Sequence, residues 1–419
     1  MDQNRPIGED IDWLVLDLNS FFASCEQQHK PRLRGKPVGI VPMENVDSTC
    51  ILAASYEAKR FGIKTGTPVY EAKQRCPEII LMKATHGRYT EYHYRVMDAI
   101  ESCTHIDRVM SIDEVACQMT GSQRKPENAI ALAHKIKETI ARDVGECLTS
   151  SIGIAPNILL AKLASDMMKP NGLVLIRPCD LPDKLLPLEL RDFSGVGPGT
   201  ERRLNMNGIF TVKDLYNCSR RQLRAVWGGV EGERFYDRIW GMNSNRAETK
   251  KSVLGHQHVL EPHLRNHQGA YHVLHHLTIK AAERLRSVGY FCTRLSLDIK
   301  MESRSRHVPG AKWALDTNFG QTQDTQFLLK IFETLWKHAP QDRPLRVGVT
   351  LSGLVASSAH QMDLFEKPKP KTLVSALDEL NKKFGRHKVG FGLNPYVLEK
   401  VGKDRIAFQS VPKRGDYFT

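Results

Sequence analysis

Three acidic residues stand out because each one adjoins aliphatic residues. Asp17 ends the apolar run 13–16, and Asp113 and Glu114 are flanked by an isoleucine and a valine. Such runs are typical of buried strands, where an ionised carboxylate is costly unless it is paired or metal-bound. Carboxylates that converge from two strands suit Mg²⁺, which keeps room for phosphate oxygens. The pattern predicts a magnesium site; the alternative is that the acidic pair forms a turn or an ion pair with Arg108.

Basic residues at the ends of predicted elements form a second group. Segment 55–60 ends in Lys59 and Arg60, and segment 169–172 begins with Lys169. Charged donors at such positions can bind the oxygens of a triphosphate. Any one of them, taken alone, is more commonly an exposed surface residue.

A glycine-rich turn precedes a helix that carries two arginines. Segment 193–200 reads FSGVGPGT, with glycines at Gly195, Gly197 and Gly199. Glycines allow close approach of the backbone, and a following helix offers free N–H groups to an anion. This pattern is typical of a helix-hairpin-helix that binds the DNA backbone.

The elements that must position these groups are of two kinds. Short predicted strands alternate with amphipathic helices up to about residue 176, which indicates an α+β domain. The pattern is all-helical over 186–243. After a linker at 249–252, the predicted order is β-α-β-β-α-β, which describes two helices packed on a four-stranded sheet.

One strand of this later sheet has a clear two-residue period. Polar and apolar residues alternate along 294–301, from Arg294 to Lys300 on the polar side. One face of the strand is therefore predicted to be packed, and the other is free to meet a ligand.

Composition excludes several classes of protein. The chain has 419 residues, 41% of them hydrophobic, which is enough for a buried core and for several domains. No apolar run approaches the ~18 residues of a membrane span, and the polar N-terminus does not resemble a signal peptide. The nine cysteines are scattered without a CxxC pair. Neither a disulfide framework nor a zinc module is predicted, and a reducing cytoplasm fits.

The positive charge is concentrated in the later part of the chain. The net charge is +13, with +2 over residues 1–250 and +11 over residues 251–419. A basic module attached to a nearly neutral one indicates a polyanionic partner, although a merely soluble basic surface is about equally consistent with charge alone.

Placed in order, these motifs resemble those of the Y-family, translesion DNA polymerases, nearest to the bacterial polymerase IV group. The resemblance covers about residues 12–355. The matching segments are the first metal motif (16–26), the triphosphate-binding finger helix (55–62), the second metal motif (111–114), the last palm segment (152–172) and the entry to the little finger (251–255).

The resemblance implies roles for individual residues. Asp17, Asp113 and Glu114 would hold two Mg²⁺ ions, with the Leu18 carbonyl as a further ligand. The residues implied to bind the incoming deoxynucleoside triphosphate are Phe21, Phe22, Tyr56, Lys59, Arg60 and Lys169. Phe22 would be the steric gate against a ribose 2′-OH, whereas without the motif it would be read as a core aromatic. Arg294, Lys300 and the three glycines of the hairpin would bind DNA.

Two positions depart from the family pattern. Asn19 stands where the family usually has a second acidic residue, and Lys59-Arg60 reverses the usual order of arginine and lysine. The second departure leaves open which of the two side chains reaches the triphosphate. Segment 41–48 matches no family pattern, so the preferred lesion is not predicted.

A short peptide near the C-terminus resembles the segment by which bacterial polymerases bind the sliding clamp. It contains Gln361, Leu364 and Phe365, and the two apolar side chains would anchor in a pocket of the clamp. Local packing of Leu364 and Phe365 is the alternative. Residues 373–384 have helical spacing and are predicted to be a structural helix.

The resemblance implies an α+β polymerase shaped like a right hand. Its predicted parts are the palm (1–26 and 84–176), the fingers (27–83), the helical thumb (177–243), a linker (244–251), the little finger (252–355), and a clamp-binding peptide with a tail (356–419). The implied function is translesion synthesis in DNA damage tolerance with low fidelity and no proofreading, by a cytoplasmic monomer that binds primer-template DNA and the clamp. A non-catalytic DNA- and clamp-binding adaptor and a different palm-type enzyme, such as a nucleotide cyclase, are the alternatives.

Overall fold

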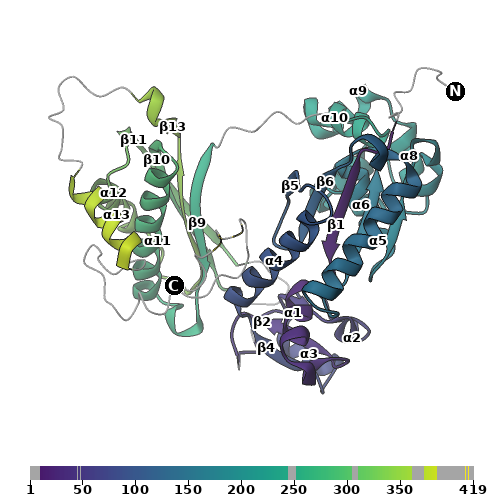
Figure 1. The fold of residues 1–419 in the computed structure, drawn as a ribbon. Helices are drawn as coiled ribbons and strands as arrows, with labels where there is room; N and C mark the ends of the chain where they lie inside the picture. The colour runs from purple at the N-terminus through teal and green to yellow at the C-terminus, as the bar shows by residue number, and fades with distance from the viewer. Residues whose placement is uncertain are drawn as a thin grey trace. The chain divides into compact units, whose positions relative to one another are not determined.

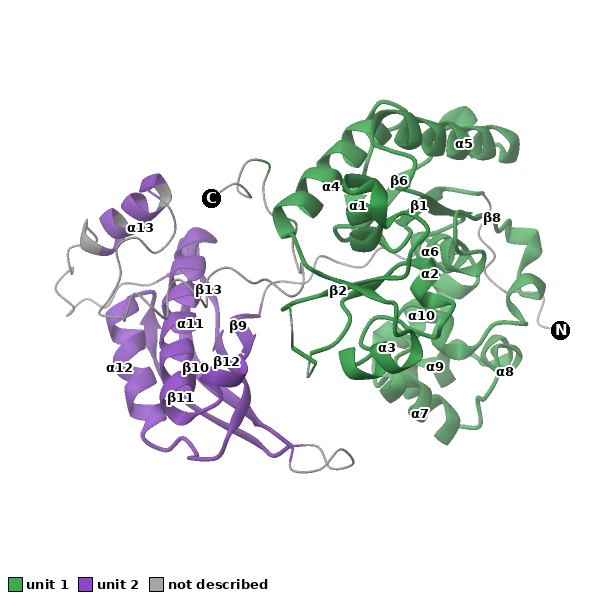
Figure 2. Ribbon diagram, turned by 90° about the horizontal axis from the view of Figure 1, so that it is seen from below, with its two compact units in different colours: residues 1–246, 405–419 green, residues 247–404 purple. Residues whose placement is uncertain are grey.

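The computed structural model describes residues 10–44, 46–47, 49–243, 252–303, 310–360 and 372–384, together with residues 411 and 414. The chain divides into two compact units, which comprise residues 1–246 with 405–419 and residues 247–404 (Figure 2). Both units combine strands and helices, as predicted for an α+β protein.

The first unit contains a five-stranded sheet (Figure 1). Its strands are β1 (Trp13–Leu18), β5 (Arg108–Val109), β6 (Glu114–Gln118), β7 (Ser150–Ala155) and β8 (Leu173–Leu175). They lie in the order β5-β6-β1-β7-β8, and all neighbours are antiparallel except the parallel pair β7 and β8. Strand β1 runs past the predicted apolar run, so Asp17 is part of the strand, while Asp113 lies in the turn that leads into β6.

The helices of this unit cover the sheet and build a separate helical region. They are α1 (Phe21–His29), α2 (Tyr56–Lys59), α3 (Val69–Arg75), α4 (His86–Glu101), α5 (Pro126–Asp143), α6 (Ile158–Met167), α7 (Pro198–Met206), α8 (Val212–Asn217), α9 (Arg220–Trp227) and α10 (Val230–Ile239). The all-helical stretch predicted after residue 186 is thus α7 to α10.

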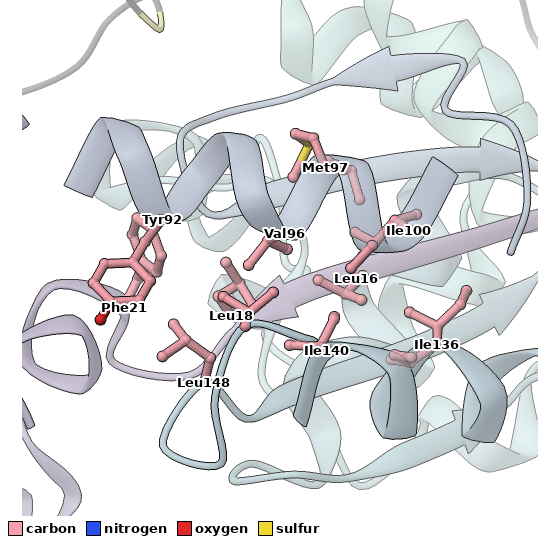
Figure 3. Packing of buried hydrophobic residues seen from close by; sticks show 14 of the residues in the cluster. Leu16, Leu18, Phe21, Tyr92, Val96, Met97, Ile100, Ile136, Ile140 and Leu148 are labelled. Carbon is pink, nitrogen blue, oxygen red and sulfur yellow. The ribbon is translucent and has the colours of Figure 1, made fainter. Parts of the chain in front are cut away.

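The two faces of β1 pack against different helices. Leu16 and Leu18 lie in one core with residues of α4 and α5 (Figure 3). Val15 lies in a second core with residues of α6. Because successive side chains of a strand point to opposite faces, Asp17 shares the face of Val15 and is directed toward α6. By the same alternation, Glu114 of β6 faces α6 as well.

A glycine allows α6 to lie close to this face of the sheet. A Cβ atom at Gly153 would be 2.0 Å from the carbonyl oxygen of Ala161 and 2.4 Å from the nitrogen of Ser165. The helix is also anchored at its start, where the Asn157 side chain accepts a hydrogen bond from the Leu160 N–H at 3.0 Å. Any larger residue at position 153 would displace the helix and the side chains it carries.

A small second sheet lies in the segment predicted to be the fingers. It has the order β3-β2-β4, with strands β2 (Val38–Val41), β3 (Ala53–Ala54) and β4 (Ile80–Lys83). The helix predicted for 56–61 is shorter than expected, because α2 ends at Lys59. The N–H groups of Phe61 and Gly62 bond three residues back, and Gly62 adopts a positive φ of 74°.

The second unit has the predicted β-α-β-β-α-β order. Its elements are β9 (Val253–Val259), α11 (His267–Ser287), β10 (Tyr290–Met301), β11 (Lys312–Thr322), α12 (Thr325–Trp336) and β12 (Pro344–Ser352), followed by β13 (Val355–Ala356) and α13 (Thr372–Phe384). The antiparallel sheet has the order β11-β10-β12-β9. Leu295 and Leu297 are fully buried whereas Arg294 is exposed, which confirms the predicted alternation along β10.

Helix α13 is held to α11 of the same unit by an ion pair. The guanidinium of Arg286 donates to both carboxylate oxygens of Asp378, at 2.7 and 2.9 Å. In the described residues, none of the helices combines the length and apolar character that a membrane crossing requires.

Candidate active site

Asp17 and Glu114 meet on the face of the sheet that α6 covers. The two residues are direct partners in the register of β1 and β6. Lys162 projects from α6 between them: its ammonium is hydrogen-bonded to Asp17 Oδ2 and lies 2.8 Å from Glu114 Oε1. One cationic group therefore contacts both carboxylates.

A second ammonium reaches the same carboxylate from the loop after α6. Lys169 Nζ lies 2.8 Å from Asp17 Oδ1 and 2.7 Å from Asp166 Oδ1. Asp166 also lies 3.2 Å from Lys162 Nζ. The result is a network in which two lysines and three carboxylates alternate.

The network changes the acidity of its members. Burial alone would raise the pKa of Asp17, but Lys162 and Lys169 together lower it below its ordinary value. Burial raises the pKa of Glu114, and the charge of Asp17 adds to this effect. Burial also opposes the charge of Lys162, yet Asp17 and Glu114 outweigh it and raise the pKa of the lysine. The carboxylates thus hold a positive charge firmly between them.

Asp113 lies beside this network without sharing its cations. Its carboxylate accepts a hydrogen bond from the Ser111 hydroxyl at 2.5 Å, and its backbone oxygen accepts one from the Leu18 N–H at 2.9 Å. Burial, followed by the negative charge of Asp17, raises the pKa of Asp113 above its ordinary value. Within the described residues, no lysine or arginine forms an ion pair with Asp113. A buried carboxylate in this state gains from any added cation.

These carboxylates fit a hard divalent cation. In the part of the chain that the structure describes, no three histidine, cysteine or acidic side chains are grouped around an open metal position. The Lys162 ammonium instead lies between Asp17 and Glu114 and contacts both carboxylates. Carboxylate oxygens from neighbouring strands are the ligands that Mg²⁺ prefers.

Three of the six predicted triphosphate-binding residues lie near Asp17: Lys169 contacts it, and Tyr56 and Lys59 are close enough for its charge to affect their pKa values. Lys59 Nζ lies 4.2 Å from the centre of the Tyr56 ring. Partial burial, followed by the nearby charge of Lys169, lowers the pKa of Lys59, and burial raises the pKa of Tyr56. Lys59 and Arg60 are both exposed, Lys59 as the last residue of α2 and Arg60 as the residue after it, and the charge of Lys169 acts on Lys59.

Phe22 is held by a tyrosine from a distant helix. Its ring stacks on Tyr89 of α4, with centroids 4.3 Å apart and planes 11° apart. The Tyr89 hydroxyl donates to the fully buried Glu26 at 3.1 Å, and Arg88 donates to both oxygens of Glu26 at 2.7 and 2.6 Å. Phe22 is half-buried, but its neighbour Phe21 belongs to the core. An ion pair thus fixes the ring that supports Phe22.

The glycine hairpin before α7 exposes its backbone. A Cβ atom added at Gly195, Gly197 or Gly199 would meet no atom within 4 Å, and Gly195 has a φ of 98°. At the start of α7, Pro198 and Gly199 are exposed to solvent, and so are Arg202 and Arg203. This geometry leaves room for a phosphate to approach the chain closely.

The remaining predicted residues lie in the second unit or beyond the described part. Arg294 is exposed on the polar face of β10 and is paired with Asp316 of β11 at 2.8 Å. Lys300 lies on the same face and is partly exposed. The three residues predicted to bind the clamp, Gln361, Leu364 and Phe365, lie outside the described residues.

Lys162 and Asp166 were not among the residues predicted from the sequence. Helix α6 reads ILLAKLASDM, and Lys162 is its one basic residue in an otherwise apolar stretch. A lone lysine among buried residues is uncommon and usually has a partner. This signal was present, but the partner lies 145 residues away along the chain.

Comparison with known proteins places the chain among polymerases. The impB/mucB/samB family matches residues 16–166, and the C-terminal domain of that family matches residues 250–364. DNA polymerase IV from Moorella thermoacetica is 32% identical over 391 residues, which cover 91% of this chain and 96% of that protein. DNA polymerase IV 1 from Bacillus subtilis is 29% identical over 384 residues, which cover 88% and 90%.

Solved structures lead to the same group. The structure titled "Y-family DNA polymerase chimera Dbh-Dpo4(243-245)-Dbh" is 25% identical, with a TM-score of 0.67, and covers 83% of this chain and all of that one. The "Insertion ternary complex of Dbh DNA polymerase" is 26% identical over the same shares of both chains, with a TM-score of 0.54.

Proposed function

This chain belongs to the impB/mucB/samB family, the Y-family DNA polymerases, and we propose that its carboxylate cluster is the active site. At this site the enzyme would add deoxynucleotides to a primer 3′-OH opposite damaged template bases. The chain is a DNA-directed DNA polymerase of the translesion type, by its similarity to polymerase IV over nine-tenths of its length. The observation that carries the assignment of the site is that Asp17 and Glu114 lie side by side near Asp113, with Lys162 and Lys169 in contact with them.

We assign the metal-binding role to the three carboxylates and the Leu18 carbonyl. Bound Mg²⁺ would supply Lewis acidity at the primer hydroxyl and at the leaving pyrophosphate. The strands hold Asp17 and Glu114 side by side, so the negative charge of the site is preorganised and does not need to be assembled during the reaction. In the protein without bound metal, the Lys162 ammonium balances the negative charge of Asp17 and Glu114.

The incoming deoxynucleoside triphosphate binds next to these carboxylates. Lys59 and Lys169 neutralise phosphate oxygens, and the Tyr56 hydroxyl donates a hydrogen bond to one of them. We assign this role to Lys59 rather than Arg60, because the Lys59 ammonium lies 4.2 Å from the centre of the Tyr56 ring and is affected by the charge of Lys169.

Phe22 acts as the steric gate for the sugar. Its ring is half-buried and is supported from behind by Tyr89, so an edge of the ring can face a ribose 2′-OH without yielding to it. Few aromatic residues line the finger segment, which fits a roomy nascent base pair and low fidelity. No proofreading activity is proposed for the chain.

The duplex is held without reading its sequence. The Gly195–Gly199 hairpin offers its backbone N–H groups to phosphates, and the polar face of β10 offers Arg294 and Lys300. The proposed parts are the palm, fingers, thumb and little finger with the boundaries given above, in a monomer that acts in the cytoplasm.

Primer extension across a lesion tests the function. A primed template with one abasic site, incubated with Mg²⁺ and all four deoxynucleotides, should be extended past the site. Removal of the metal by EDTA should stop synthesis, because the carboxylates lose their cation, and should leave primer-template binding within about twofold. Intact DNA binding without extension on any template would instead favour a non-catalytic adaptor, and product made without a template would favour a different palm-type enzyme.

The peptide that contains Gln361, Leu364 and Phe365 is proposed to bind the sliding clamp. The double variant Leu364→Ala/Phe365→Ala should weaken clamp binding by about 30-fold or more, because two apolar anchors of an interface are lost. Surface plasmon resonance with immobilised clamp measures the affinity, and extension without clamp should not change.

A matched control is available on the neighbouring helix. Leu380 and Phe384 of α13 are exposed, at 41% and 61% of their surface. Alanine at both positions should leave clamp binding as it is. Equal binding by the wild type and the Leu364/Phe365 variant would remove the peptide from the proposal.

A further inference from the structure

The loop between α6 and β8 carries Lys169, and two positions later it carries Asn171, the residue by which the loop is held in place. Asn171 has a positive φ of 55°, which is uncommon for a residue other than glycine. A Cβ atom on the following Gly172 would lie 1.9 Å from the carbonyl oxygen of Met168. The loop is therefore tightly turned, and such a backbone persists only where its surroundings hold it.

Asn19 holds this loop from the end of β1. Its side-chain oxygen accepts hydrogen bonds from the Asn171 N–H at 2.7 Å and from the Thr149 hydroxyl at 3.2 Å. Its side-chain nitrogen donates to the Ser151 hydroxyl at 2.9 Å. Only 1% of Asn19 is exposed, so this amide is a buried group whose two ends are both satisfied.

Lys137 of α5 holds the same residue from the other side. Its ammonium donates to the Asn171 carbonyl oxygen at 2.8 Å, to the Asn171 side-chain oxygen at 2.8 Å and to the Ser150 carbonyl oxygen at 2.6 Å. All three donors of the ammonium are used. Burial lowers the pKa of Lys137 to about 8, because the charged ammonium loses contact with water at this position.

The two contacts connect the loop to the strand that carries Asp17. Asn19 follows β1 two residues after Asp17, and its own N–H bonds to the Thr149 carbonyl at 2.9 Å. Lys169 lies two residues before Asn171 and contacts Asp17 at 2.8 Å. Asn19 therefore sets the positions of both partners of this ion pair.

We propose that Asn19 and Lys137 are positioning residues that fix the loop 168–172 and so place the Lys169 ammonium for the incoming triphosphate. The inference rests on the proposed function of Lys169. An amide at position 19 performs this task without adding another negative charge near Asp17. An aspartate could still accept from the Asn171 N–H, so Asn19→Asp is the conservative variant.

Steady-state insertion of a single nucleotide tests the proposal. Asn19→Ala and Lys137→Met should each raise the KM for the deoxynucleotide about tenfold, while the Kd for primer-template stays within about twofold. Lys169→Ala should raise the same KM. Asn19→Asp and Lys137→Arg should stay within about threefold of the wild type, and Lys135→Met, at an exposed lysine of the same helix, should have no effect.

The double variant Lys137→Met/Lys169→Ala separates positioning from a general loss of structure. If Lys137 acts through Lys169, the double variant should have the KM of Lys169→Ala alone, because residues that act as a unit are not additive. Additive effects, or an unchanged KM in Asn19→Ala and Lys137→Met beside a raised KM in Lys169→Ala, would overturn the inference. An unchanged KM in Lys169→Ala would overturn the proposed role of Lys169 itself.

A milder variant covers the case in which the alanine or methionine protein does not fold. Asn171→Gly keeps the positive φ and removes one of the three acceptors of Lys137. It should raise the KM about threefold, with an unchanged melting temperature and DNA affinity. An unchanged KM in this variant would count against the proposal.

Discussion

Asp113→Ala is expected to reduce templated primer extension by about 10³-fold or more while leaving DNA binding unchanged. Asp113 is one of the three carboxylates to which we assign the metal, and it lies in the turn before β6, where its carbonyl oxygen accepts a hydrogen bond from the Leu18 N–H next to Asp17. Removing it takes away charge that must be balanced during nucleotide transfer, but it removes nothing from the hairpin or the sheet face that we assign to DNA binding.

The same substitution should not destabilise the fold. Burial and the charge of Asp17 raise the pKa of Asp113, which means that the folded protein disfavours the ionised form. At neutral pH the carboxylate is therefore a cost to folding, and its loss should leave the melting temperature unchanged or higher. Asp17→Ala is a poorer test, because it would leave Lys162 and Lys169 without their main partner.

Three measurements on the purified variant decide this prediction. They are single-nucleotide insertion, primer-template affinity by fluorescence anisotropy, and thermal unfolding. Glu127→Ala, which removes an exposed carboxylate from α5, is the matched control and should extend primers normally. Synthesis by Asp113→Ala within tenfold of the wild type would refute the assignment of the metal-binding carboxylates.

Phe22→Ala is expected to lower the discrimination against ribonucleotides by about 100-fold. The Phe22 ring stacks on Tyr89 and is thereby kept in one place, so a sugar that carries a 2′-OH meets a rigid obstacle. Alanine removes the obstacle. The measured quantity is the ratio of kcat/KM for a deoxynucleotide to kcat/KM for the matching ribonucleotide.

The alternative is that Phe22 has only a packing role. Two controls distinguish this role from that of a steric gate. Loss of packing would lower the insertion of both sugars together, whereas loss of a gate raises ribonucleotide insertion specifically. Tyr89→Phe keeps the stacked ring and loses the hydroxyl that donates to Glu26, so it should retain most of the discrimination. An unchanged ratio in Phe22→Ala would exclude the gate.

Local patterns in the sequence predicted much of the fold. The two-residue alternation along β10 predicts its buried face, because the side chains of a strand point to opposite sides in turn whatever the strand pairs with. The β-α-β-β-α-β order of the second unit followed from similar short-range periodicity. The helix at 56–61 was predicted too long, because its final turn is replaced by 3₁₀-type bonds that end at Gly62.

The candidate site likewise has a part that the sequence predicted and a part that only the structure revealed. Asp17, Asp113 and Glu114 are identifiable in the linear chain because a carboxylate beside an apolar strand is costly and therefore conspicuous. The ammonium that balances two of them comes from Lys162, and the aromatic support of Phe22 comes from Tyr89. The lone lysine of α6 is visible in the sequence, but the partner in each of these contacts is not indicated by any local pattern.

The amino-acid order therefore indicates which residues are candidates for the chemistry, since residue type and strand or helix period are properties of short segments. Which charges neutralise one another, and which side chains hold Lys169 and Phe22, depends on how α4, α5 and α6 pack against the sheet. Those contacts join residues up to 152 positions apart, and they exist only after the chain has folded. Long-range packing, with the burial that it brings, is the physical reason that they could not be read in advance.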